Sequence, residues 1–242
     1  MRLLPLVFLL AAFGANAQDY DREQRWAAEV VPNLVVGDAV QLKLPSGREF
    51  LGLYVENKTA KRAILLVHGI GVHPDHSVIG ILRTTLADMG YATLSIQMPV
   101  QRSDAAPYEY PPLFPEAAAR IQAGADWLAA RGFPRPVLLS HSLGSRMASV
   151  YFERTPGAPF AAWVCMGLSG DFGRMGNVKV PVLDLYGEND LPGVLRADWR
   201  RRLMLNAVPG STQIMIKGAD HFYVDRETQL AGTIGEFLEK LK

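Results

Sequence analysis

The sequence has a single cysteine among its 242 residues and almost no excess of one charge, with 25 basic and 24 acidic residues. A single cysteine cannot form a disulfide within the chain. Cys165 lies in the apolar stretch 161–168, where we expect buried packing rather than chemistry. Because the charges balance, the composition does not suggest a nucleic acid or an anionic membrane as a partner, and neither is expected.

The one local basic cluster is Arg200-Arg201-Arg202. It lies in segment 194–207, whose apolar residues have helical spacing. We interpret the cluster as the solvated face of that helix.

The first 17 residues, MRLLPLVFLLAAFGANA, have the pattern of a secretory signal peptide. Arg2 precedes a mostly apolar run that is shorter than the roughly 20 residues of a membrane-spanning helix. The run ends in Ala15-Asn16-Ala17, an A-x-A cleavage signal, and no cysteine follows for a lipid anchor. We expect cleavage after Ala17, export to the periplasm or medium, and no stable membrane insertion. Residues 18–242 have a length that suits one large domain.

Apolar runs and helical spacings alternate along the rest of the chain. Segments 36–44 and 50–55 indicate an antiparallel strand pair, and 18–33 is interpreted as a surface lead-in segment. Further strands are predicted at 63–67, 92–98, 136–139, 161–168, 180–186 and 212–216. Helices are predicted at 78–89, 116–130, 143–153, 194–207 and 228–241. This order predicts an α/β fold: a doubly wound, mostly parallel sheet of about eight strands with helices on both faces.

The stretch 138–144, LLSHSLG, is typical of a buried strand that stops at a serine and turns directly into a helix. Such a turn exposes the serine hydroxyl and requires small residues two positions before and after it, the G-x-S-x-G pattern. Around Ser142, Gly144 meets this requirement and Ser140 replaces the first glycine. The pentapeptide by itself does not decide between a nucleophile and an ordinary buried strand.

Two other strand ends carry groups that serve a serine nucleophile. Strand 180–186 is followed by Asp190, and strand 212–216 by His221. Because functional groups collect at the carboxyl ends of parallel strands, Ser142, Asp190 and His221 are expected to meet. A histidine with an ordinary pKa of about 6.5 can accept and return the serine proton near neutral pH, and an acid can fix its tautomer.

Three other acids compete for the role of Asp190. Asp184 lies inside a predicted strand, and Glu188 is two residues short of the usual acid position. Asp220 adjoins His221, and neighbouring side chains at a strand end point in opposite directions. Asp190 is therefore the preferred acid.

The segment His68-Gly69-Ile70-Gly71 follows strand 63–67, and its glycines let the backbone turn tightly and approach a substrate closely. We expect His68 to brace this turn and His141 to pack beneath the serine turn. His73, Asp75 and His76 lie close together but lack the further ligand that a zinc site needs. No metal or other cofactor is predicted.

With its serine, acid and histidine in this chain order, the sequence resembles the α/β-hydrolase fold family from about residue 36 to its end. The H-G-x-G segment, the His73-Pro74-Asp75 loop and Met98-Pro99 are similar to an uncharacterised group of exported bacterial proteins of this kind. The resemblance implies a serine hydrolase that usually acts on carboxylic esters. It also implies the roles of the site residues: Ser142 as nucleophile, His221 as base, Asp190 as acid, and the backbone amides of Ile70 and Leu143 as the oxyanion hole.

The gap between strands 161–168 and 180–186 is too short for a large cap domain, so an open site is expected. The proline-rich loop 101–114, with Tyr108 and Tyr110, is either a wall of the substrate pocket or an ordinary surface crossover. As a wall, together with His68 and His141, it would suit a small or medium apolar acyl group or an aryl ester.

These observations predict an exported serine esterase that forms an acyl-enzyme with a small ester or acyl substrate. Two alternatives remain. One is a non-catalytic envelope protein that uses the fold for binding or assembly, because a fold does not determine a function. The other is an acyltransferase, which shares the first half-reaction and passes the acyl group to an acceptor other than water.

Overall fold

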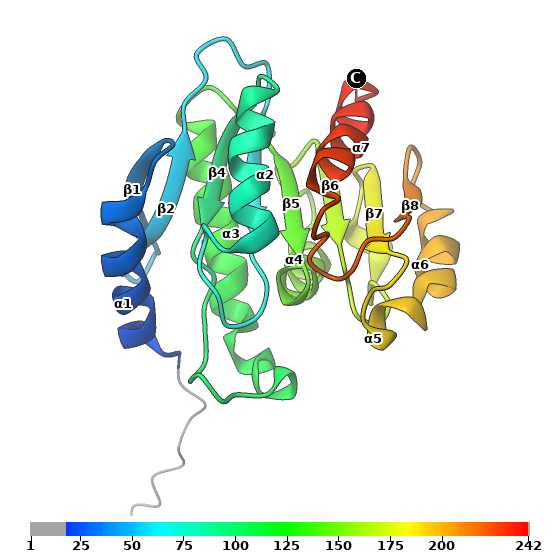
Figure 1. The fold of residues 1–242 in the computed structure, drawn as a ribbon, viewed down its shortest axis with the longest axis horizontal. Helices are drawn as coiled ribbons and strands as arrows, with labels where there is room; N and C mark the ends of the chain where they lie inside the picture. Colours follow the sequence, from blue (N-terminus) through cyan, green and yellow to red (C-terminus); the bar gives the residue numbers. More distant parts are fainter. Residues whose placement is uncertain (1–17, 242) are drawn as a thin grey trace, which may run out of the picture.

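The computed structural model describes residues 18–241, and its strands form one eight-stranded sheet in the order β1-β2-β4-β3-β5-β6-β7-β8 (Figure 1). The strands are β1 (Asp38–Lys43), β2 (Glu49–Val55), β3 (Ala63–Val67), β4 (Ala92–Ile96), β5 (Val137–His141), β6 (Ala162–Met166), β7 (Val182–Gly187) and β8 (Thr212–Ile216). β2 pairs antiparallel with β1 and with β4, and the other neighbours are parallel. The predicted mostly parallel sheet is confirmed. The expected signal peptide lies outside the described residues.

Helices cover both faces of this sheet (Figure 1). They are α1 (Tyr20–Val30), α2 (Ser77–Asp88), α3 (Phe114–Ala129), α4 (Leu143–Arg154), α5 (Pro192–Leu195), α6 (Asp198–Leu205) and α7 (Glu227–Glu239). Leu65 and Leu138 pack in the core under α3 and α4, whereas Leu66 and Leu139 pack under α2 and α7. Successive strand residues point to opposite faces, so strands covered on both sides are continuous apolar runs in the sequence.

The stretch between β6 and β7 contains only the short 3-10 helix Met175–Asn177, and no large cap covers the sheet edge in the described chain. Cys165 of β6 is buried, as expected, and burial raises the pKa of its thiol. None of the helices within residues 18–241 has both the length and the apolar character to cross a membrane.

The surface lead-in segment predicted at 18–33 contains a helix that the sequence pattern did not reveal: residues 20–30 form α1, and its residues other than Val30 remain at least partly exposed. Val30, at the end of this helix, is buried against β2. Near its start, Glu23 forms a 3.0 Å ion pair with Arg120 of α3, whose side chain is fully buried. The charged residues that suggested a surface segment therefore include one that is paired inside the protein, which a hydropathy pattern does not reveal.

The predicted helix 194–207 is two helices, α5 and α6, and its basic cluster is not a uniform solvated face. Arg200 and Arg202 are exposed, but Arg201 is fully buried. The Arg201 guanidinium lies 2.8 Å from the carboxylate of Asp184 on β7 and donates to the backbone oxygen of Leu168. This pair ties α6 to the sheet and uses Asp184 structurally.

We expect Arg201→Ala to lower the free energy of unfolding by about 3–5 kcal/mol, because it leaves the Asp184 carboxylate buried without its cation. Arg200→Ala removes an exposed cation from the same helix and should change the stability by less than about 0.5 kcal/mol. Urea denaturation measures both values. Equal unfolding midpoints for the two variants would contradict the structural role of the buried pair.

Candidate active site

Ser142 is the single residue between β5, which ends at His141, and α4, which begins at Leu143. Its backbone has φ 57° and ψ −122°, a conformation that residues other than glycine rarely adopt. The Ser142 N–H donates to the backbone oxygen of Met166 on β6 at 2.8 Å. The strained turn places Ser142 in the wall of a cavity at the carboxyl edge of the sheet.

The small residues around Ser142 have different reasons to be small. A Cβ atom on Gly144 would lie 2.3 Å from the backbone oxygen of His68, so only glycine fits there. Ser140 is fully buried, and its Oγ accepts a 2.8 Å hydrogen bond from the Trp163 indole N–H. The Ser140 and Ser145 hydroxyls lie 3.1 Å apart and share a hydrogen bond. Ser140, which replaces the first glycine of G-x-S-x-G, is thus accommodated as a buried, hydrogen-bonded side chain, and the turn is kept.

The structure brings Ser142, His221 and Asp190 together. His221 Nε2 lies 2.9 Å from Ser142 Oγ, and His221 Nδ1 lies 2.6 Å from Asp190 Oδ1. Asp190 follows β7 and His221 follows β8, so three strand ends supply the three side chains. A histidine bonded to both a hydroxyl and a carboxylate can take a proton from the hydroxyl without changing its orientation.

Asp190 is held as a carboxylate although it is only 4% exposed. Burial raises its pKa, but the hydrogen bond and charge of His221 and the backbone N–H groups of Gly187 and Leu191 outweigh burial and hold the pKa below its usual value. The two N–H groups lie 3.1 and 2.7 Å from the carboxylate oxygens. The site therefore contains a fixed negative charge beside Nδ1 of the imidazole.

The loops that carry the acid and the histidine are tied to each other. The Glu188 carboxylate accepts a 2.9 Å hydrogen bond from Gly218 N–H, which gives this rejected acid a structural role. Asp220 accepts hydrogen bonds from backbone N–H groups within its own loop. Gly167, with φ 58°, lies against the imidazole, since a Cβ there would be 2.9 Å from His221 Cε1.

His68 is fully buried at the end of β3 and has a defined tautomer. Its Nε2 accepts a 2.8 Å hydrogen bond from Met98 N–H, so the proton is on Nδ1, which donates to Gly69 O at 2.9 Å. Burial lowers the pKa of His68 to about 3, which keeps the ring neutral. The bond to Gly69 O orients the peptide whose N–H belongs to Ile70, so these contacts suit a bracing role.

Both predicted oxyanion donors belong to backbone close to Ser142. Leu143 is the first residue of α4, and the first N–H groups of a helix have no partner within it and carry its positive dipole end. Ile70 lines the same cavity as Ser142. Gly69 allows this approach, because a Cβ there would lie 3.1 Å from Ser142 Cβ.

His141 lies beneath the turn and also borders the cavity. Its Nε2–H donates to the backbone oxygen of His221 at 2.8 Å, and the two rings have centroids 4.8 Å apart. Burial, with a smaller effect of the neighbouring His221, lowers the pKa of His141 to about 4. His141 therefore supports the loop of His221 as a neutral ring.

The cavity beside Ser142 has a volume of about 250 Å³. Its walls are the glycine turn after β3, the first turn of α2 and the loops after β7 and β8, and they include the apolar residues Val72, Val78, Ile79, Leu191 and Phe222. No lysine, arginine, aspartate or glutamate is among the described residues that line it.

The tyrosines of loop 101–114 are not part of this cavity wall, contrary to one of the two interpretations of that loop. Tyr108 is 82% exposed, and Tyr110 is buried with its hydroxyl accepting a hydrogen bond from Gln101 N–H. The wall comes instead from Val78 and Ile79, in the first turn of α2, the helix that follows the loop beginning with the H-G-x-G segment. Their place in the first helical turn after that loop is the signal that could have identified them.

The loop between β3 and α2 also holds the three residues weighed as metal ligands. Asp75 forms a 2.7 Å ion pair with Arg83 of α2. His73 packs edge to face against His76, and His76 borders the cavity.

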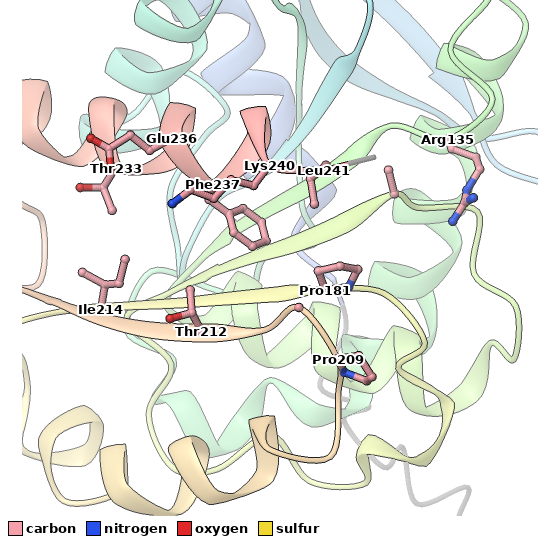
Figure 2. Close-up of a pocket in the computed structure, with 12 residues that line it drawn as sticks. Arg135, Pro181, Pro209, Thr212, Ile214, Thr233, Glu236, Phe237, Lys240 and Leu241 are labelled. Atoms are coloured by element: carbon pink, nitrogen blue, oxygen red, sulfur yellow. The ribbon is translucent and has the colours of Figure 1, made fainter.

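A larger cavity, of about 800 Å³, lies at the opposite end of the parallel strands (Figure 2). It is bordered by the start of β8 at Thr212, by Pro181 before β7, and by Phe237 and Lys240 near the end of α7. Its described lining contains no serine, cysteine or histidine, whereas Ser142 and His221 both line the smaller cavity.

Comparison with known proteins agrees with this architecture. A family described as "Protein of unknown function (DUF3530)" matches residues 3–119. No curated protein sequence matches the chain significantly. A dienelactone hydrolase from Anabaena variabilis superposes with a TM-score of 0.70 at 22% identity, covering 84% of this chain and 97% of that one.

Two esterase structures are also similar. Esterase Pf2001 from Pyrococcus furiosus has a TM-score of 0.67 at 13% identity, covering 88% of this chain and 96% of that one. Est1E from Butyrivibrio proteoclasticus has a TM-score of 0.64 at 14% identity, covering 84% and 98%. The chain therefore has the α/β-hydrolase fold. At these identities the likeness establishes the fold, and the activity has to be argued from the site.

We expect Ser140→Gly, which restores the G-x-S-x-G text, to lower the free energy of unfolding by about 1–3 kcal/mol, because the buried Trp163 N–H loses its acceptor. Ser103→Ala, at an exposed loop serine, is the control and should be nearly neutral. Thermal and urea denaturation measure the difference. A variant as stable as the wild type would show that this hydrogen bond contributes nothing net.

The pKa of His68 predicts acid sensitivity. It is about 3 in the folded protein and 6.5 for an ordinary histidine, so between these values the unfolded chain binds a proton that the folded protein lacks. Stability is then lost as the pH falls from 6.5 towards 3. His68→Gln should reduce the slope of unfolding free energy against pH, between about pH 4.5 and 6, by about 1.4 kcal/mol per pH unit. At pH 8, where histidine is neutral in both states, the difference reports the lost hydrogen bonds alone. A slope identical to that of the wild type would refute the buried neutral state.

Proposed function

We propose that this protein is a serine hydrolase that cleaves carboxylic esters through an acyl-enzyme. The observation that carries the proposal is the continuous chain of hydrogen bonds from Ser142 Oγ to His221 and on to Asp190, at 2.9 and 2.6 Å. It stands at a strained strand-to-helix turn on an α/β-hydrolase fold, where a serine is exposed to a cavity.

In the proposed reaction, His221 Nε2 accepts the Ser142 proton as Oγ attacks the ester carbonyl carbon. The carbonyl oxygen becomes an oxyanion that accepts hydrogen bonds from the N–H groups of Ile70 and Leu143. When the intermediate collapses, the bond to the alcohol breaks and His221 gives its proton to the leaving oxygen. Water then attacks the acyl-serine by the same route and releases the carboxylic acid and free Ser142.

Asp190 acts through His221 in this scheme. Its carboxylate accepts a hydrogen bond from the Nδ1–H group, so Nε2 is the free acceptor that faces Ser142 Oγ. The same negative charge stabilises the imidazolium that forms during attack. His68 and His141 do not compete as bases, because burial lowers their pKa values to about 3 and about 4.

The cavity supports a short, uncharged acyl or aryl group as the bound part of the substrate. Its volume of about 250 Å³ corresponds to roughly eight water-sized volumes of about 30 Å³ each. Its walls have no acidic side chain, lysine or arginine, within the described residues, that would pair with a charged group. We expect short-chain esters to be turned over faster than long-chain esters.

Export belongs to the proposal on the strength of residues 1–17 alone, and it places the enzyme in the periplasm or outside the cell. A non-catalytic binding protein is less well supported, since the 2.9 Å bond between His221 and Ser142 has no need to exist in a scaffold. An acyltransferase shares every contact up to the acyl-enzyme. Product analysis with alcohols and amines present distinguishes transfer from hydrolysis.

The decisive test is a comparison of the wild type with Ser142→Ala. The wild type should react with a fluorophosphonate probe and release nitrophenol from a short-chain nitrophenyl ester. The variant should not be labelled, and its turnover should fall by about 10⁴-fold or more, because a triad acts as a unit. Ser169→Ala, an exposed serine nearby, should retain both activities. Folded wild-type protein that is neither labelled nor active would refute the proposal.

A further inference from the structure

Helix α1 contacts the loop that carries the proposed oxyanion donor. Arg22, in the first turn of α1, donates from Nη2 to the backbone oxygen of Gly71 at 3.0 Å. It also donates from Nη1 to the backbone oxygen of Gln101 at 2.9 Å. Gly71 directly follows Ile70, whose N–H is the proposed donor. One guanidinium thus connects the loop after β3 to the loop after β4.

The loop needs a tether of this kind. It is glycine-rich, and a glycine without a Cβ restricts its backbone less than any other residue. Gly71 has φ 65°, a conformation that other residues rarely adopt. His68 holds the peptide before Ile70 through its bond to Gly69 O. Arg22 holds the carbonyl group of the peptide that follows Gly71. The peptide that carries the Ile70 N–H is therefore held through its own carbonyl group, and the chain just after it is held at Gly71 O.

Helix α1 is itself anchored, so Arg22 is a stable point of attachment. Asp19 N–H donates to Val100 O at 2.8 Å, and the Asp19 carboxylate caps the helix by accepting from Arg22 N–H at 2.9 Å. Glu23 forms its buried ion pair with Arg120 of α3 at 3.0 Å.

A second line of contacts runs from the same helix to the cavity. The Arg22 guanidinium stacks over the ring of Trp26, 4.5 Å from its centroid. Trp26 packs edge to face against His73, with ring centroids 5.9 Å apart. His73 packs in turn against His76, which borders the cavity. Helix α1 therefore supports the β3–α2 loop at two places.

From these contacts we propose that Arg22 is a positioning residue of the active site, which holds the loop of Ile70 in the geometry that stabilises the oxyanion. This inference rests on the proposed serine hydrolase function. The role requires a guanidinium, because two carbonyl groups from different loops are bonded by two nitrogens of one planar fork. A lysine ammonium at the same place keeps the charge but not this fork.

The test compares Arg22→Ala and Arg22→Lys with Arg25→Ala, which removes an exposed cation from the same helix. Active sites are counted with the fluorophosphonate, so that kcat refers to folded, competent enzyme. We expect kcat per active site to fall by about 10- to 100-fold in Arg22→Ala, with KM within about twofold, because a small misplacement of a transition-state donor has this effect. In Arg22→Lys the kcat per active site should fall several-fold, and in Arg25→Ala it should equal that of the wild type.

Two readouts separate positioning from a loss of stability. Methylguanidinium should raise the kcat of Arg22→Ala several-fold, and it should leave the kcat of the wild type unchanged. A boronic acid that mimics the tetrahedral intermediate should bind Arg22→Ala about tenfold less tightly, in line with a defect specific to the transition state. A destabilised but correctly positioned enzyme would show fewer active sites with normal kcat, no rescue and normal boronate affinity, and this result would overturn the proposal.

Hydrogen exchange of the segment 68–73 tests the tether without any activity. Exchange should be faster in Arg22→Ala than in Arg25→Ala. Equal exchange in the two variants would overturn the inference about Arg22, even in an active enzyme. A wild type that is neither labelled nor active would instead refute the proposed hydrolase, whatever the exchange shows.

Discussion

The close approach of the serine turn to the end of β3 is the constraint on which the rest of the site depends. A Cβ on Gly144 would lie 2.3 Å from His68 O, so α4 begins in direct contact with the backbone that leads into the glycine turn. The same contact brings Gly69 against Ser142. Ser142 and the loop of one of the two proposed oxyanion donors therefore lie against each other at a single backbone contact, where Ser142 has a positive φ.

Burial then separates the roles of the titratable groups around this contact. His68 and His141 are close to the serine but remain neutral, with pKa values lowered to about 3 and about 4. Asp190 is buried as well, yet its hydrogen bonds hold its pKa low and keep it charged. The two neutral rings only donate or accept fixed hydrogen bonds. In the proposed reaction this leaves His221, which faces the Asp190 carboxylate, as the group that takes the serine proton.

The site is also less local than its three central residues imply. Glu188 joins the acid loop to the histidine loop through Gly218, and Arg22 joins the glycine turn to the loop after β4. The polar residues of loops and of α1 thus fix the backbone around a cavity whose walls are mainly apolar. Because these bonds hold the backbone in place before a substrate binds, the proposed site would need no reorganisation at the moment of reaction.

The sequence by itself determined the order of strands and helices and the selection of Ser142, Asp190 and His221, because buried strands are continuous apolar runs and their carboxyl ends meet at one edge. Only the tertiary structure decided which polar residues are buried and paired, as with Arg201 and Glu23, and which segments form the cavity wall. Ion pairs between distant segments and the packing of a loop depend on contacts across the fold, and these leave no periodicity in the sequence. For that reason the contacts of Arg22 in helix α1 with the loops after β3 and β4 could be identified only from the tertiary structure.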